Sequence, residues 1–164
     1  MRMTIIAFTI LGEPASKANS RELVTLRYRD ADTGELHRRP RLRKSDKALA
    51  YERAALRQIP PMHRVRLTGP VCVTLRIFYA TERPDLDESV VLDVLQDRYS
   101  YVYRNKERVR ELVAKGVYRN DRQVREKHIY HGIDRTNPRT EIVVEALTAQ
   151  QHALAFECPN PLEA

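Results

Sequence analysis

The run Val71–Ala80 constrains the fold of this chain more than any other segment, because it is apolar and rich in β-branched and aromatic residues. Such a composition is typical of a buried strand. Pro84 lacks a backbone N–H donor and favours an extended conformation at Arg83, so we expect the strand to end there. The residues that follow are then expected to project from the end of a core strand.

Three carboxylates lie within the four residues after this proline: Asp85, Asp87 and Glu88. Paired acids at a strand end can hold a hard divalent cation through their oxygens. The alternative is that Asp85 or Asp87 caps the N-terminus of the next helix, a position that Asp favours.

Length and composition predict one domain with a hydrophobic core, since the chain has 164 residues of which 42% are hydrophobic. No apolar stretch is long enough to cross a bilayer, and Met1–Ile6 lacks the length and cleavage site of a signal peptide. Cys72 and Cys158 lie far apart, which argues against a disulfide framework or a zinc site. We therefore expect a cytoplasmic protein that does not bind membranes.

The positive charge is concentrated in one segment. The formal charge is +7, and residues 35–66 hold ten Lys or Arg against three acids, so the remainder of the chain is balanced. A basic segment near an acidic centre suits a protein that binds phosphates near a metal. The alternatives are a solvated basic face without a partner, or an anionic membrane surface.

The pattern of apolar residues predicts a single α+β domain over residues 1–147, with a mixed β-sheet and flanking helices, followed by a tail over 148–164. Ser45 is expected to cap a helix whose apolar face carries Ala48, Tyr51 and Ala55. The other predicted strands cover residues 3–11, 23–28, 36–38, 123–132 and 140–147, and the other predicted helices cover 88–96 and 105–115. For residues 99–109 a hairpin competes with the helix that Asn105 would cap.

Several basic side chains are expected to contact a phosphate backbone. Two lie in the polar loop 12–21, two precede the helix that begins after Ser45, and three lie on the polar face of that helix. These candidates are Lys17, Arg21, Arg43, Lys44, Lys47, Arg53 and Arg57.

Asp121 begins another predicted strand after a glycine-containing turn. If this strand neighbours Val71–Ala80, then Asp85, Asp87 and Asp121 converge on one point. One or two Mg²⁺ ions, or Mn²⁺, could bind there, orient a phosphodiester and activate water. This arrangement indicates phosphodiester hydrolysis, although spacing alone does not exclude a nucleotidyl transferase.

Four motifs in order resemble the RusA family of Holliday junction resolvases. They are Gly12-x-Pro14-x-Ser16-Lys17, Arg83-Pro84-Asp85-Leu86-Asp87, Leu92-Asp93-Val94-Leu95 and Asn120-Asp121-Arg122-Gln123-Val124. The family patterns are G-x-P-x-x-K, R-P-D-x-D-N, L-D-A-L and D-D-x-Q-V. The resemblance extends over residues 5–147.

This resemblance implies a RusA-like fold and a homodimeric, Mg²⁺-dependent endonuclease that nicks four-way DNA junctions symmetrically, in DNA recombination and repair. The family's essential aspartates correspond to Asp85, Asp87 and Asp121, which would be both metal ligands and catalytic residues. Asp93 corresponds to the helix aspartate and Lys17 to the loop lysine. Two active sites in a twofold dimer would match the symmetry of the junction.

The chain departs from the family pattern at three places. Glu88 replaces an Asn and is an additional candidate acid, and Val91 replaces a lysine that could stabilise transition-state charge. Lys17, Lys115 and Lys127 are candidates to replace that lysine. An inserted segment, about residues 97–115, is expected to act as a lid, a dimerisation element or a DNA contact.

Other interpretations remain open for individual residues and for the whole chain. Asp93 is either a functional acid or a partnered buried one, His128 and His131 are expected at the surface, and the tyrosines at 99, 101 and 103 either pack or stack on bases. The alternative function is a catalytically impaired protein that binds branched DNA without cutting it. A third is a nuclease acting on ordinary duplex.

Overall fold

A four-stranded mixed sheet, in the order β1-β8-β4-β7, lies at the centre of the computed structural model, which describes residues 4–147. Its strands are β1 (Ile5–Leu11), β8 (Arg139–Ala146), β4 (Val71–Tyr79) and β7 (Val124–Ile133). β8 pairs antiparallel with both β1 and β4, whereas β4 and β7 are parallel. The predicted tail, 148–164, lies outside the described residues.

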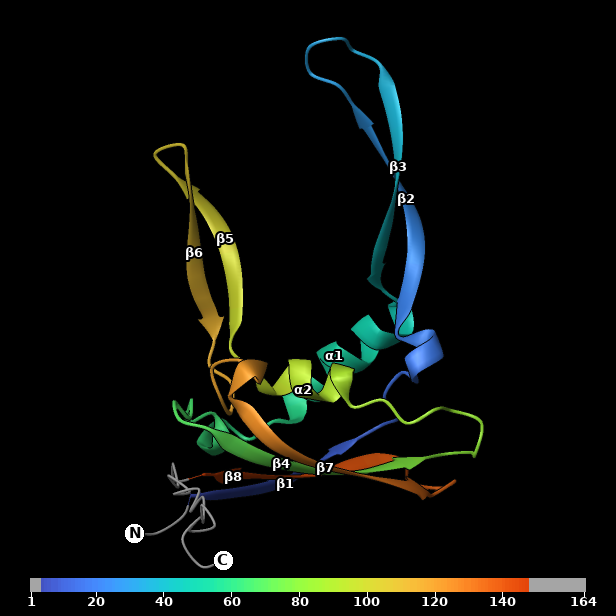
Figure 1. The fold of residues 1–164 in the computed structure, drawn as a ribbon, viewed down its shortest axis with the longest axis vertical. Helices are drawn as coiled ribbons and strands as arrows, with labels where there is room; N and C mark the ends of the chain where they lie inside the picture. Colours follow the sequence, from blue (N-terminus) through green and yellow to red (C-terminus); the bar gives the residue numbers. More distant parts are fainter. Residues whose placement is uncertain (1–3, 148–164) are drawn as a thin grey trace, which may run out of the picture.

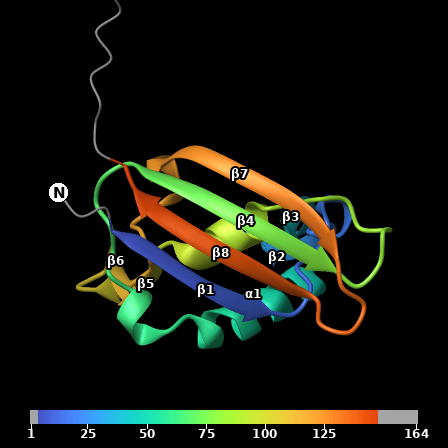
Figure 2. The ribbon, with the colours of Figure 1, turned by 90° about the horizontal axis from the view of Figure 1, so that it is seen from below.

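Helices cover one face of this sheet: α1 (Asp46–Gln58) and α2 (Ser89–Leu95) lie on the same side, and the other face is seen without a helix in Figure 2. Val73, Leu75 and Ile77 of β4 point toward the helices and are fully buried. The prediction of a buried strand at 71–80 is thus confirmed. The molecule is a single mixed α+β domain, as predicted.

The first strand is only half buried, contrary to the expectation of a wholly buried one. Ile6 and Ile10 lie in the core, whereas Ile5 and Leu11 are 56% and 54% exposed. The reason is that β1 is an edge strand of a sheet whose core lies on one side, so its alternate side chains point to the uncovered face.

The predicted N-terminus of α1 is confirmed, because the Ser45 side chain accepts a hydrogen bond from the N–H of Ala48 at 3.1 Å. Ala48, Tyr51 and Ala55 pack into the core, as their helical spacing predicts. The short 3₁₀ turn η2 (Pro61–His63) follows the helix. The predicted helix at 88–96 is confirmed as α2.

Two β-hairpins project from the helical side of the domain (Figure 1). We call them arm 1, formed by β2 (Arg21–Arg29) and β3 (Leu36–Lys44), and arm 2, formed by β5 (Arg98–Arg104) and β6 (Glu107–Ala114). Each pairs only within itself, in separate two-stranded sheets. Arm 1 is longer than predicted, since its strands extend to Arg21 and Lys44.

The helix predicted over 105–115 is wrong, and the competing hairpin is found instead. Asn105 and Lys106 have φ angles of 50° and 67°, which form a two-residue turn of the type that joins antiparallel strands. Asn105 tolerates this conformation, so it turns the chain and does not cap a helix.

The remaining connections include two short 3₁₀ turns and a close crossing at a glycine. The 3₁₀ turn η1 (Lys17–Asn19) precedes arm 1, and η3 (Asp121–Gln123) precedes β7. A Cβ atom on Gly116 would lie 2.4 Å from the backbone oxygen of Leu95, so only glycine fits at this crossing. Within residues 4–147, no helix is long and apolar enough to span a membrane.

Candidate functional site

The loop between β4 and α2 carries the acids that the sequence singles out, and we call residues 85–88 the acid loop. Its conformation is fixed by Tyr79, the last residue of β4. The Tyr79 hydroxyl accepts a hydrogen bond from the N–H of Asp87 at 3.2 Å and donates to the carbonyl of Asp85 at 3.3 Å. Asp85 is exposed, whereas Asp87 is buried.

One carboxylate oxygen of Asp87 accepts a hydrogen bond from the start of α2. Its Oδ1 accepts from the N–H of Ser89 at 2.9 Å, at the first residue of α2. The N-cap residue of α2 is Glu88, so the prediction that Asp85 or Asp87 occupies that position is wrong, although Asp87 still accepts from the first N–H of the helix. Within residues 4–147 the other oxygen makes no hydrogen bond, so the bond to Ser89 and metal ligation by Asp87 are compatible.

The loop after β1 lies beside the acid loop, because β1 and β4 run in the same direction and end at the same edge of the sheet. Glu13 of that loop accepts a hydrogen bond from the N–H of Ala80 at 3.0 Å. Burial raises the pKa of Tyr79, and the negative charges of Asp87, Glu13 and Glu88 raise it further. The Tyr79 hydroxyl thus stays protonated and can donate.

Two lysines neighbour the acid loop. Lys127 of β7 places its Nζ 2.5 Å from Glu88 Oε1, and this bond is the main reason that the pKa of Glu88 is lowered. The charge of Lys17 lowers the same pKa. Of the three predicted replacements for the missing lysine, Lys127 contacts Glu88 directly, the charge of Lys17 lowers the pKa of Glu88, and Lys115 follows β6, where its carbonyl accepts from Arg64. Val91 itself is fully buried in the core.

The expected convergence of Asp85, Asp87 and Asp121 is not found within the described part of one chain. Asp121 is exposed in η3, just before β7, and the ligand atoms of these three residues do not lie within 4.8 Å of one another. β4 and β7 are neighbours, as the prediction required, but they are parallel, with Val71 opposite Val124. Asp121 therefore precedes a strand at the edge of the sheet where β4 begins, while the acid loop follows β4 at the opposite edge.

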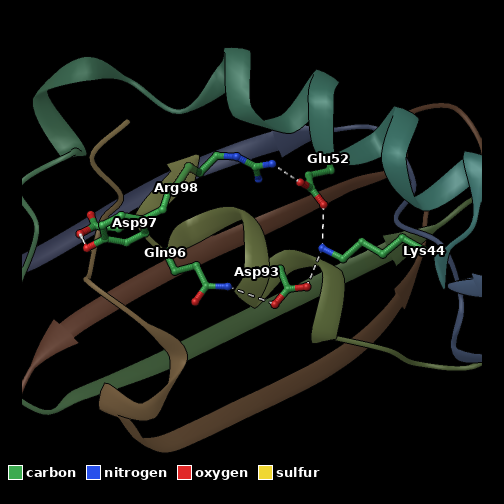
Figure 3. Close-up of a pocket in the computed structure, with 7 residues that line it drawn as sticks. Lys44, Glu52, Asp93, Gln96, Asp97 and Arg98 are labelled. Atoms are coloured by element: carbon green, nitrogen blue, oxygen red, sulfur yellow. Dashed lines mark hydrogen bonds and ion pairs between the residues drawn. The ribbon is translucent and has the colours of Figure 1, made fainter. Parts of the chain in front are cut away.

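Asp93 belongs to a separate charged cluster, shown in Figure 3. Lys44, the last residue of β3, places its Nζ 2.6 Å from Asp93 and 2.7 Å from Glu52 of α1. Arg98, the first residue of β5, contacts the other oxygen of Glu52 at 2.5 Å. The interpretation of Asp93 as a partnered acid thus accounts for its contacts.

Lys44 is therefore less suited to DNA contact than its sequence position indicates. Burial lowers its pKa, but the bonds to Asp93 and Glu52 outweigh this, and the net result is a raised pKa. Its charge is already compensated by two carboxylates. The cluster borders a cavity of about 230 Å³ that is lined by Lys44, Glu52, Asp93, Gln96, Asp97, Arg98 and Tyr99.

The other predicted DNA contacts lie at the surface. Lys17, Arg21, Arg53 and Arg57 are exposed, Lys47 is 3.3 Å from Glu13, and Arg43 is paired with Glu22 and Asp46. The structure adds exposed basic residues that the sequence analysis did not select: Arg38, Arg39 and Arg41 on arm 1, and Arg108 and Arg110 on arm 2. The excess of basic residues in 35–66 signalled the first three.

A further set of metal-ligand types lies on the uncovered face of the sheet. Cys72 of β4 and Glu126 and His128 of β7 form the one group of three in residues 4–147 whose ligand atoms lie within 4.8 Å of one another. Burial raises the pKa of the Cys72 thiol, and Glu126 and Glu145 raise it further. The thiolate form is thus disfavoured, and this group is separate from the acid loop. His128 and His131 are exposed, as predicted.

No protein-family model matches this chain, and no curated protein matches it.

Proposed function

We propose that this chain is a Mg²⁺-dependent, structure-selective endodeoxyribonuclease that resolves four-way DNA junctions by paired symmetric nicks. The observation that supports this best is the meeting of two motif loops at one sheet edge. The Gly12-x-Pro14-x-Ser16-Lys17 loop and the β4–α2 connection that carries the acid loop are about 70 residues apart in sequence, yet Glu13 accepts a hydrogen bond from the N–H of Ala80, and the charge of Lys17 lowers the pKa of Glu88.

Asp85 and Asp87 are the residues proposed to hold the ion. An exposed carboxylate beside a buried one, with one oxygen uncommitted, suits a hard cation that retains part of its water shell. When bound, Mg²⁺ would polarise the scissile phosphate and lower the pKa of the attacking water. Lys17 and Lys127 would stabilise developing negative charge. Asp121 remains a proposed ligand only if binding or assembly brings it to this site.

Basic surfaces support DNA as the substrate. Arm 1, residues 21–44, holds eight Lys or Arg against four acids, and arm 2, residues 98–114, holds five against two. Both arms project from the helical side, so a branched DNA could contact both (Figure 1). A homodimer in the cytoplasm, which would supply two active sites for a twofold junction, belongs to the same proposal.

The test is incubation of the purified protein with a labelled four-way junction and its linear duplex, with and without Mg²⁺ or Mn²⁺. We expect paired nicks on the junction alone, lost in Asp87→Asn together with metal binding. Asp46→Asn, which removes an exposed carboxylate from α1, is the matched control and should cleave normally. Cleavage of the duplex at an equal rate would indicate the duplex nuclease instead.

A second function, recognition of branched DNA without cleavage, is favoured by three observations. Val91 is buried where the family has a lysine, Glu88 is neutralised by Lys127, and Asp121 lies apart from Asp85 and Asp87. Tight junction binding without nicks under either ion would select this function. Asp121→Asn distinguishes further, since it should leave binding unchanged and abolish nicking only if Asp121 reaches the site.

A further inference from the structure

One face of arm 2 carries an alternating series of tyrosines and arginines, which we call the Tyr/Arg face. Its residues come from alternate positions of the two strands: Tyr99, Tyr101 and Tyr103 of β5, and Arg108 and Arg110 of β6. Tyr101 pairs with Arg110 and Tyr103 with Arg108 across the hairpin, so all five side chains point to the same side.

Cation–π contacts order this face. The Arg108 guanidinium lies 3.8 Å from the centre of the Tyr101 ring, and Arg110 lies 3.7 Å from that of Tyr99. These are diagonal contacts between the strands, within the distance at which such pairs attract. Stacking on the ring restrains each guanidinium. Its N–H donors, which lie in the plane of the guanidinium, stay available for phosphate oxygens.

The two faces of arm 2 differ in charge. The acids of the hairpin, Glu107 and Glu111, lie on the opposite face, where Glu111 pairs with Arg104. The Tyr/Arg face therefore has two cations and no carboxylate from its own hairpin. Its chemistry is complementary to a polyanion.

The root of the face is fixed to the domain. The Tyr99 hydroxyl donates to Asp97 at 3.2 Å and accepts from Arg66 at 3.3 Å, and Asp97 and Arg66 form an ion pair at 2.7 Å. Asp97 also accepts from the N–H of Gly116 at 2.9 Å, where the chain returns from β6. These bonds hold both ends of arm 2, so its orientation is set before any partner binds.

The tip of the face is open. Tyr101 is 55% exposed and Tyr103 is 75% exposed, so both rings are accessible to a ligand. Exposed rings beside cations are the features with which proteins bind single strands, since every base has a π-face that can stack on an aromatic ring.

We propose that the Tyr/Arg face of arm 2 binds unpaired bases of DNA, with Tyr103 and Tyr101 stacking on bases and Arg108 and Arg110 contacting the adjacent phosphates. This inference rests on the proposed function only for the source of the unpaired bases. That source would be the open centre or a single-stranded flank of a branched DNA. Binding itself requires neither metal nor cleavage.

The test measures the affinity of the full chain for a fluorescein-labelled 12-nucleotide oligo-dT and for a 12-base-pair duplex, by anisotropy at fixed salt without divalent ions. Tyr103→Leu keeps an apolar side chain but removes the ring. We expect it to weaken oligo-dT binding roughly fivefold or more, since stacking contributes about that factor per base, and to change duplex binding less than twofold.

Two further variants make the result specific. Tyr103→Phe keeps the ring and should bind oligo-dT within about twofold of the wild type. Tyr130→Leu on β7 is the matched control, because Tyr130 is also half exposed and also contacts an arginine, Arg76, yet lies on the uncovered sheet face. Tyr130→Leu should leave the affinities for oligo-dT and for the duplex unchanged.

Several results would overturn the proposal. Unchanged oligo-dT binding by Tyr103→Leu would exclude base stacking at this tip, and equal weakening of single-strand and duplex binding would indicate a backbone contact only. Retained stacking without any nicking of junctions would instead refute the nuclease and leave the Tyr/Arg face in place, so the two failures are distinguishable.

Discussion

At the scale of single residues, the acid loop shows how a buried hydroxyl positions acids. Tyr79 is fully buried, so its hydroxyl must find partners, and it finds them in the backbone of Asp85 and Asp87. The loop is therefore held by main-chain bonds, which leaves the side-chain carboxylates of Asp85 and Asp87 less committed. Carboxylates of this kind retain oxygens that can ligate a metal ion.

Placing at position 91 the lysine of the RusA pattern should destabilise the fold and not supply a catalytic cation. Val91 is fully buried among core side chains of α2, and an ammonium group there would be desolvated without a partner. We expect Val91→Lys to lower the free energy of unfolding by about 3 kcal/mol or more. Urea denaturation followed by circular dichroism measures this loss.

The matched control is Val113→Lys on β6, where the side chain is 65% exposed. That substitution should change the free energy of unfolding by no more than about 0.5 kcal/mol. Equal stability of the two variants would mean that position 91 can reach solvent, and that the lysine could act from there.

The candidate site could be predicted from the sequence only in part. The apolar run ends at Ala80 and β4 ends at Tyr79, so Asp85 and Asp87 follow the strand as predicted, although the strand stops before it reaches Pro84. The place of Asp121 depends on whether β7 runs parallel or antiparallel to β4, and no residue in either strand encodes that direction. Glu13 was missed for a related reason, since only the order β1-β8-β4 brings the end of β1 to the acid loop.

At the scale of elements, arm 2 shows where the sequence pattern was ambiguous. Val109, Leu112 and Val113 can share a helix face, which favoured a helix, but Tyr99, Tyr101 and Tyr103 alternate as strand residues do. The turn at Asn105 and Lys106 lets the second strand pair with the first, and pairing overrides helical propensity. Helix α1 was predictable because its Ser45 cap and its apolar spacing agree, whereas α2 was predicted from its apolar run alone.

One side chain of α1, Glu52, contacts both arms. It lies on α1, is 5% exposed, and contacts Lys44 at the end of β3 and Arg98 at the start of β5. We expect Glu52→Gln to lower the free energy of unfolding by about 2 kcal/mol. This is less than the roughly 3–5 kcal/mol for breaking a fully buried pair, because Lys44 and Arg98 retain access to water.

The same contact predicts a pH dependence. Burial raises the pKa of Glu52, but the bonds from Lys44 and Arg98 outweigh it, so the folded-state pKa lies below the usual 4.5. A lowered pKa gives stability that is present above pH 4.5 and is lost as the pH falls through the folded value. The difference in Tm between wild type and Glu52→Gln should therefore be constant near neutral pH and shrink below pH 4.5.

Glu107→Gln on the exposed end of β6 is the control, and its Tm should match the wild type at every pH. Hydrogen exchange supplies a second readout, since Glu52→Gln should speed exchange at the roots of both β3 and β5. Faster exchange in one arm only would contradict a shared anchor.

At the scale of the whole molecule, the two projecting arms carry an excess of basic residues. A two-stranded hairpin has no core of its own and is only marginally stable alone, yet arm 1 exposes Leu23, Leu36 and Leu42 together with its arginines. Such an element is expected to gain stability from a partner. Its excess of cations makes a polyanion the partner that best fits its charge.

The salt dependence of junction binding should therefore depend on arm 1. Arg38, Arg39 and Arg41 are exposed on β3, and each phosphate contact that is lost should reduce the slope of log K against log salt by about 0.9. We expect the triple variant to glutamine to bind more weakly and with a shallower slope, by up to about 2.7. Arg76→Gln on the uncovered sheet face should leave the slope unchanged, because that face points away from both arms. A triple variant with the wild-type slope, or an Arg76→Gln slope reduced by about one, would place the DNA on the sheet face and not between the arms.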